Sequence, residues 1–145
     1  MTRVLAIDPG ISKCGVIIAD TKEKKVYEAV VISSHLLLKY VKKKYHNEKN
    51  IKFLIGNGTS SKNFIKDLNQ FVPNIIVAEE KNSTFRAKQR YFEIFPVIGI
   101  KSFLPREIFI LNKNLDALAA LIILEDYFQV KFDFSEKMRT KTWLK

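Results

Sequence analysis

Four acidic residues stand where apolar segments of the sequence begin or end. Asp8 and the adjacent Glu79 and Glu80 follow short apolar runs, and Asp116 lies near the start of a long one. Carboxylates at close range repel one another unless a cation joins them. Mg²⁺ and Mn²⁺ prefer oxygen ligands, and two such ions about 3.5–4 Å apart can activate a water and stabilise the leaving oxygen of a phosphodiester. If the acids meet in the folded chain, they therefore indicate metal-dependent phosphodiester hydrolysis.

The N-terminal part of the chain predicts strands. Short apolar runs span Val4–Ile7, Gly15–Ala19 and Val26–Ile32, and the first of them ends at the turn sequence Asp8-Pro9-Gly10. Three strands joined by tight turns favour an antiparallel meander.

From Ser33 onward, the apolar spacing alternates between helical and strand periods. Serine and threonine can cap the predicted helices, and Pro73 should stop the second one. The predicted elements are a helix from Ser33 or Ser34 to about Tyr45, a strand Ile51–Ile55, a helix from Ser60 or Ser61 to Val72, a strand Asn74–Ala78, and a helix from Ser83 or Thr84 to about Phe92.

A long loop is expected over Glu93–Asn114, followed by a helix, Asn114–Phe128, that is apolar almost all round and should be largely buried. This order predicts an α/β fold with a mixed five-stranded sheet, in which three antiparallel strands precede two parallel ones and helices cover both faces. The carboxyl ends of parallel strands meet at one edge, where open α/β sheets place their sites. If the last helix begins over that edge, the acids converge there.

Three segments resemble the RuvC and YqgF branch of the RNase H-like nucleases, most closely YqgF. They are Val4–Val16 with its Asp-Pro-Gly turn, Ala78–Thr84 with two acids, a lysine and a Ser-Thr pair, and Leu115–Phe128 with an Asp, small residues and a closing aromatic pair. The segments lie in the family's order and span most of the chain. The resemblance implies an RNase H-like fold.

The resemblance also implies that Asp8, Glu80 and Asp116 are the catalytic acids and the metal ligands, with Mg²⁺ or Mn²⁺ as the cofactor and two ions in the site. It favours Glu80 over Glu79. RuvC carries a further Asp where this chain has Lys113. An endonuclease acting on structured nucleic acid is therefore expected.

Two substrates follow from the resemblance, namely branched DNA of the Holliday-junction type and precursor 16S rRNA. Resolving a junction needs two symmetric cuts and hence a homodimer, whereas an RNA-processing enzyme could act as a monomer. The YqgF-like last helix favours rRNA processing.

The charge balance favours a polyanionic partner. Twenty-five Lys and Arg residues against fifteen Asp and Glu residues give a formal net charge of +10. The candidates for phosphate contacts are Lys13, Lys62, Lys81, Arg86 and Arg90. A second basic cluster, over residues 39–49, and a basic C-terminal tail, residues 131–145, add to this surface.

Length and composition limit the other possibilities. We expect residues 1–145 to form a single domain, because 47% hydrophobic residues can build a core. No apolar run reaches the roughly 18–20 residues of a membrane span, so no membrane partner is expected. One cysteine and the lack of a signal-peptide pattern predict a cytoplasmic protein.

Two other functions stay open at this point. The chain could be a nucleic-acid-binding module with weak or no catalysis, in which Asp8 orders a turn and Asp116 is a favourable charge at a helix N-terminus. It could also be a nucleotide-binding fragment of the actin and sugar-kinase fold, which shares an Asp-x-Gly hairpin but normally needs two such domains to enclose ATP.

Overall fold

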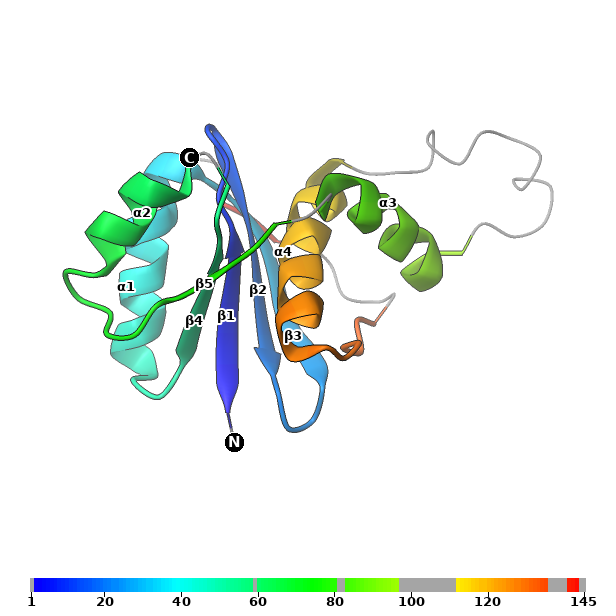
Figure 1. Cartoon of the computed structure of the whole chain (residues 1–145), viewed down its shortest axis with the longest axis horizontal. Helices are drawn as coiled ribbons and strands as arrows, with labels where there is room; N and C mark the ends of the chain where they lie inside the picture. Colours follow the sequence, from blue (N-terminus) through cyan, green and yellow to red (C-terminus); the bar gives the residue numbers. More distant parts are fainter. Residues whose placement is uncertain (1, 59, 81–82, 97–111, 136–140, 144–145) are drawn as a thin grey trace.

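The structure, a computed structural model, describes residues 2–58, 60–80, 83–96, 112–135 and 141–143. Its centre is a sheet with the strand order β5-β4-β1-β2-β3-β6 (Figure 1). The strands are β1 (Arg3–Asp8), β2 (Lys13–Asp20), β3 (Lys25–Ser33), β4 (Lys52–Gly56), β5 (Ile76–Ala78) and β6 (Lys141–Trp143).

The strand directions follow the predicted pattern. β1, β2 and β3 form an antiparallel meander, while β4 runs parallel to β1 and β5 runs parallel to β4. The predicted α/β fold, with three antiparallel strands followed by two parallel ones, is confirmed. The carboxyl ends of β1, β4 and β5 therefore lie at the same edge of the sheet.

Two strands differ from the prediction. β6 pairs in parallel with β3 and extends the sheet from five strands to six, within the segment that the sequence suggested was a tail. Three residues are too few to show a periodic pattern. β5 begins at Ile76 rather than Asn74, because Asn74 has a φ of 58°, which a strand does not accommodate.

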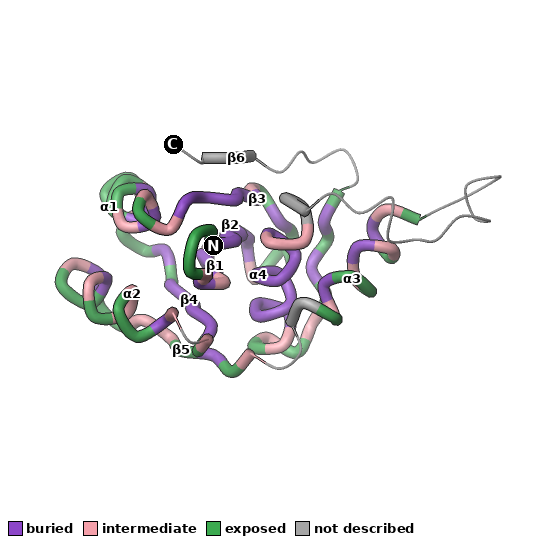
Figure 2. Tube along the Cα trace, turned by 90° about the horizontal axis from the view of Figure 1, so that it is seen from above, coloured by how far each residue is buried: buried purple, intermediate pink, exposed green. Residues whose placement is uncertain are grey.

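Helices cover both faces of the sheet, as predicted (Figure 2). α1 (Leu37–Asn47) and α2 (Ser61–Leu68) lie on one face, and α4 (Asn112–Phe128) lies on the other, with α3 (Ser83–Ile94) packed against α4. The middle of α4, residues 117–124, is buried throughout, which confirms the prediction of a buried last helix. No helix in the described parts of the chain combines the length and apolarity needed to cross a membrane.

The helix starts differ from the predicted serine caps. Ser34–Leu36 form a 3₁₀ turn before α1, and within the described structure neither Ser33 nor Ser60 caps its helix through its side chain. The Ser34 hydroxyl instead donates a hydrogen bond of 2.9 Å to the carbonyl of Gly10. A serine before an apolar run is therefore used here to hold the β1–β2 turn.

Candidate active site

Asp8 is the last residue of β1 and lies opposite Gly15 of β2. The turn that follows Asp8 is tight, since a Cβ atom on Gly10 would lie 2.1 Å from the Lys13 carbonyl oxygen. Ser34 fixes this turn, because its amide donates to the Ser12 carbonyl at 2.9 Å and its hydroxyl donates to Gly10. Asp8 is thus placed at the end of a central strand with a rigid connection behind it.

Glu80 follows β5 at the same edge of the sheet. Asn57, which follows β4, accepts a hydrogen bond of 2.9 Å from the Glu80 amide through its side-chain oxygen. The Asn57 amide donates to the Ala78 carbonyl, also at 2.9 Å. The two bonds align the chain after β5 with the end of β4 and set the direction of Glu80.

Two glycines leave room for the Glu80 carboxylate. A Cβ atom would lie 2.0 Å from Glu80 Oε1 if added to Gly56, and 2.9 Å from Glu80 Oε2 if added to Gly58. The sequence Gly-Asn-Gly at the end of β4 therefore leaves the space that the Glu80 side chain occupies. Asn57, between the two glycines, positions Glu80 through its side-chain oxygen. The only sequence signal for this arrangement was the pair of glycines, Gly56 and Gly58, at the end of a predicted strand.

Asp116 approaches from the second turn of α4, which begins at Asn112, two residues before the predicted start. A Cβ atom on Gly15 would lie 1.8 Å from the Asp116 carbonyl oxygen, so the helix can reach the sheet only because residue 15 has no side chain. Gly15 is in turn the strand partner of Asp8. The predicted acids Asp8, Glu80 and Asp116 are therefore brought to one region by β1, the end of β5 and α4.

The acids interact electrostatically. Burial, a hydrogen bond with the Glu80 carboxylate and the negative charges of Glu80 and Asp116 raise the pKa of Asp8 to about 8. Burial also raises the pKa of Asp116, and the ammonium of Lys13 opposes this shift. At neutral pH, the Asp8 carboxyl group is therefore mostly protonated.

The donor set suits a hard divalent cation. When Asp8 and Glu80 are both ionised, the buried Oε1 atom of Glu80 has no hydrogen-bond donor among the described residues. A bound Mg²⁺ or Mn²⁺ ion would satisfy this oxygen and offset the repulsion. In the arrangement that the described residues adopt, however, no three acidic, histidine or cysteine side chains are gathered closely enough to hold an ion. The oxygen ligands that Mg²⁺ and Mn²⁺ prefer are therefore present. Of the three acids, Asp8 and Glu80 are the two whose carboxyl groups contact each other.

The predicted phosphate contacts fall into different environments. Lys13 is exposed at the start of β2, directly after the β1–β2 turn, and is close enough to Asp116 to affect its pKa. Lys62 is exposed in the first turn of α2, which begins near the edge where β4 ends. Lys81 lies outside the described residues.

Arg86 and Arg90 are engaged within the fold. The guanidinium of Arg86 forms a bidentate salt bridge with the carboxylate of Asp126 on α4. The Arg90 side chain is 12% exposed, and it donates to Glu125 at 3.0 Å and to the Phe132 carbonyl at 2.8 Å. Both charges tie α3 to α4 in the fold, and the predicted phosphate contacts of the two arginines stay a prediction.

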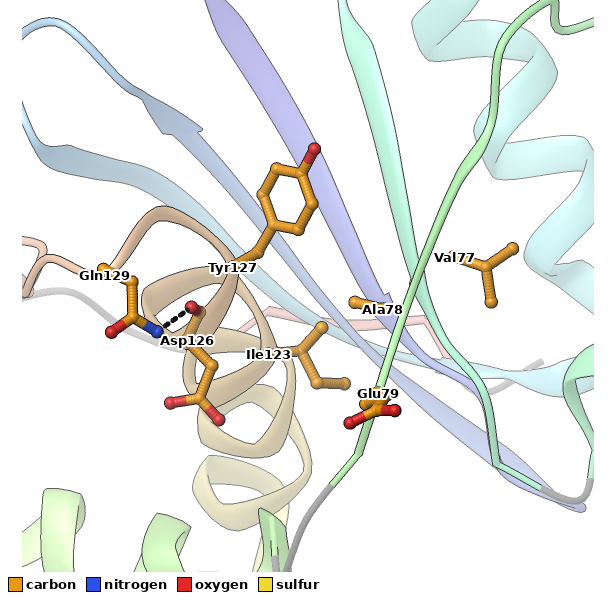
Figure 3. A pocket seen from close by; sticks show the side chains of 7 residues that line it. All are labelled: Val77, Ala78, Glu79, Ile123, Asp126, Tyr127 and Gln129. Atoms are coloured by element: carbon orange, nitrogen blue, oxygen red, sulfur yellow. Dashed lines mark hydrogen bonds between the residues drawn. The ribbon is translucent and has the colours of Figure 1, made fainter.

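Glu79 belongs to a separate cavity. This cavity of about 480 Å³ lies between β5 and α4, where Glu79 and Asp126 line it together with Ile123 and Tyr127 (Figure 3). Because side chains alternate along an extended segment, Glu79 faces this cavity while Glu80 reaches the glycines of β4. The preference for Glu80 as the acid that joins Asp8 agrees with this geometry.

No family model and no curated protein matches the chain. Among solved structures, the chain is similar to T. thermophilus RuvC in complex with a Holliday junction substrate. The two are 14% identical, the match covers 88% of this chain and 94% of that chain, and the TM-score is 0.49. A likeness of this degree assigns neither a family nor an activity, so the proposals below rest on the geometry of this chain.

Proposed function

We propose that this protein is a divalent-metal-dependent endonuclease that hydrolyses phosphodiesters in structured nucleic acid. The observation that carries the proposal is the contact between the Asp8 and Glu80 carboxyl groups. Burial, this contact and the charges of Glu80 and Asp116 together raise the pKa of Asp8 to about 8. Folding brings these acids together from separate strands despite their repulsion. Such an arrangement is costly to stability, and perturbed acids of this kind are typical of functional sites.

The residues of the site divide into metal ligands, a positioning residue and a phosphate contact. Asp8 and Glu80 would hold the metal, and Asp116 would complete its ligands from α4. A metal bound there would activate a water and stabilise the leaving oxygen. Asn57 positions Glu80, and the exposed Lys13 would contact a phosphate beside the reacting one. The formal net charge of +10 supports a polyanionic substrate.

The substrate is branched DNA of the Holliday-junction type or precursor 16S rRNA. A junction resolvase must place two sites with twofold symmetry, so DNA resolution predicts a homodimer when bound. Processing of rRNA predicts a monomer whose cleavage depends on the RNA 2′-hydroxyls. The YqgF-like last helix favours rRNA.

A cleavage panel tests the proposal. Labelled four-way junction, duplex DNA, RNA–DNA hybrid and precursor 16S rRNA are incubated with the protein and Mn²⁺. We expect cleavage of the junction or the rRNA, and a loss of more than about 100-fold in Asp8→Asn, because losing a ligand should exceed the 10–100-fold effect of an outer partner. Asp133→Asn is the matched control, since Asp133 is exposed and its backbone forms a β-bridge with Lys25, at the opposite end of the sheet. Cleavage that persists in Asp8→Asn would rule out this site.

A second candidate function is nucleic-acid binding without catalysis. It is favoured by the absence, among the described residues, of three ligands already gathered around one position. Binding of the same substrates, with no cleavage in Mg²⁺ or Mn²⁺ and equal affinity in Asp8→Asn, would support it.

A further inference from the structure

Ile11 is the most exposed of the large apolar side chains in the described part of the chain. It is 89% exposed and stands in the β1–β2 turn, between Asp8 and Lys13. Isolated apolar residues are common on protein surfaces, so exposure alone says little about function. The position of Ile11 beside the candidate active site is what gives it meaning.

The turn presents Ile11 rigidly. The carbonyls on either side of it, those of Gly10 and Ser12, both accept hydrogen bonds of 2.9 Å from Ser34. The close approach of Gly10 to the Lys13 carbonyl tightens the same turn. Because the backbone is held on both sides, the isoleucine side chain stays exposed to solvent. An apolar side chain contributes favourable free energy only when a partner removes its surface from water.

The neighbouring groups indicate the chemistry of that partner. Lys13 offers a positive charge directly after the turn, and Asp8 begins the turn with the candidate metal-binding carboxylate. Nucleic acid alternates apolar base faces with anionic phosphates. An apolar side chain beside an ammonium therefore matches one base step and its flanking phosphate, and inserted isoleucines can unstack and kink a duplex.

We propose that Ile11 is a wedge, which inserts between adjacent bases of the substrate so that the phosphate between them can reach the acids. The inference rests on the proposed function and names a positioning residue for it. Asp8 is only partly accessible, so a stacked, regular helix would hold its backbone away from the carboxylates. Unstacking one step supplies the distortion that brings a phosphate to the site.

Fluorescence of 2-aminopurine measures the unstacking directly. The probe base is placed at the crossover of a four-way junction, or in the precursor rRNA if the panel shows tighter binding there, and the Asp8→Asn protein serves as a cleavage-free background. We expect fluorescence to rise on binding in Asp8→Asn and in Asp8→Asn with Ile11→Leu. The rise should be lost in Asp8→Asn with Ile11→Ser. Val77→Ser is the matched control, since Val77 is a 50% exposed aliphatic residue on β5.

Binding is followed on the same samples by anisotropy, and folding by thermal melting. If all variants bind and Ile11→Ser keeps the fluorescence rise, the wedge is wrong while the proposed function stands. If folded wild-type protein binds none of the substrates, the proposed function fails and the wedge with it. With Asp8 intact, Ile11→Ser should lower single-turnover cleavage by on the order of tenfold, because a misplaced phosphate reacts slowly. Dissociation of a dimer into monomers by Ile11→Ser would instead make Ile11 a subunit contact and overturn the inference.

Discussion

Glu80 rests directly on Gly56, so closely that a methyl group on the glycine would lie 2.0 Å from the Oε1 atom of the glutamate. Gly56 ends β4, and Glu80 follows β5, the neighbouring parallel strand. The carboxylate can therefore lie at the carboxyl edge of the sheet beside Asp8 only because residue 56 has no side chain.

Gly56→Ala should separate activity from stability. The new methyl group must displace the flexible end of the Glu80 side chain. This displacement should change the free energy of unfolding little, but it moves the Glu80 carboxylate away from Asp8. A displacement of about 1 Å can lower a rate by about 100-fold. We expect a loss of this order in Mn²⁺-dependent cleavage, with a melting temperature close to that of the wild type. Gly58→Ala, where the added atom would lie 2.9 Å from Oε2, should give a smaller loss. Normal cleavage by Gly56→Ala would exclude Glu80 from the site.

The pKa of Asp8 predicts how stability depends on pH in the metal-free protein. The pKa is 3.8 for an unperturbed aspartate and about 8 in the fold, so between these values the folded state binds a proton that the unfolded state does not. The free energy of unfolding therefore falls as pH rises from about 4 to about 8. Asp8→Asn has no such proton, and its stability should fall less over this interval.

Urea unfolding in EDTA at pH 5 and pH 9 measures this difference. The wild type should lose at least about 1.4 kcal/mol more than Asp8→Asn between these two conditions, which is the value of one pKa unit. The burial-raised pKa of Asp116 acts in the same direction, but it is present in both proteins. Parallel pH profiles for the two proteins would show that the fold does not raise the pKa of Asp8.

Metal binding should reverse the instability of the acid cluster. A ligand that binds only the folded state at 100 times its dissociation constant stabilises it by about 2.7 kcal/mol. At pH 8 we expect Mn²⁺ to raise the melting temperature of the wild type, and EDTA to remove the increase. Asp8→Asn should show little response, whereas Asp133→Asn should respond like the wild type. An equal shift in Asp8→Asn would place the bound Mn²⁺ elsewhere.

The fold was predictable because its signals are local and repeated. The apolar runs of β1, β2 and β3 and the buried length of α4 each contain enough residues to show their period. β6 did not show in the sequence, since three residues carry no pattern and their strand partner β3 is far away in the chain.

The acids were predictable from the strand ends that they follow, but the groups that position them were not. The contact of Glu80 with Gly56 joins residues that are close only when β4 and β5 are paired. The internal partners of Arg90 could not be predicted for the same reason. A basic run on a helix is the same in sequence whether it faces solvent or, as here, Glu125 of α4.

Lys13 should contribute to nucleic-acid binding through its charge. Each phosphate contact on duplex DNA changes the slope of log K against log salt by about 0.9. We expect Lys13→Gln to weaken binding and to reduce this slope by about one contact, without changing the melting temperature, because Lys13 is exposed. Titrations at several salt concentrations measure the slope. An unchanged slope would remove Lys13 from the phosphate-binding surface.

Arg90→Gln should give the opposite result, a loss of stability with an unchanged salt slope. Arg90 and Glu125 are 12% and 8% exposed, and Glu125 also accepts a hydrogen bond of 2.9 Å from the Phe132 amide. Removing one partner of a buried pair leaves the other charge uncompensated and typically costs about 3–5 kcal/mol. Urea unfolding should show a loss in this range. Arg86→Gln is the control, because its side chain is 39% exposed and exposed pairs contribute under about 1 kcal/mol. If Arg90→Gln keeps its stability and instead lowers the salt slope, Arg90 contacts the nucleic acid, as its sequence position first suggested.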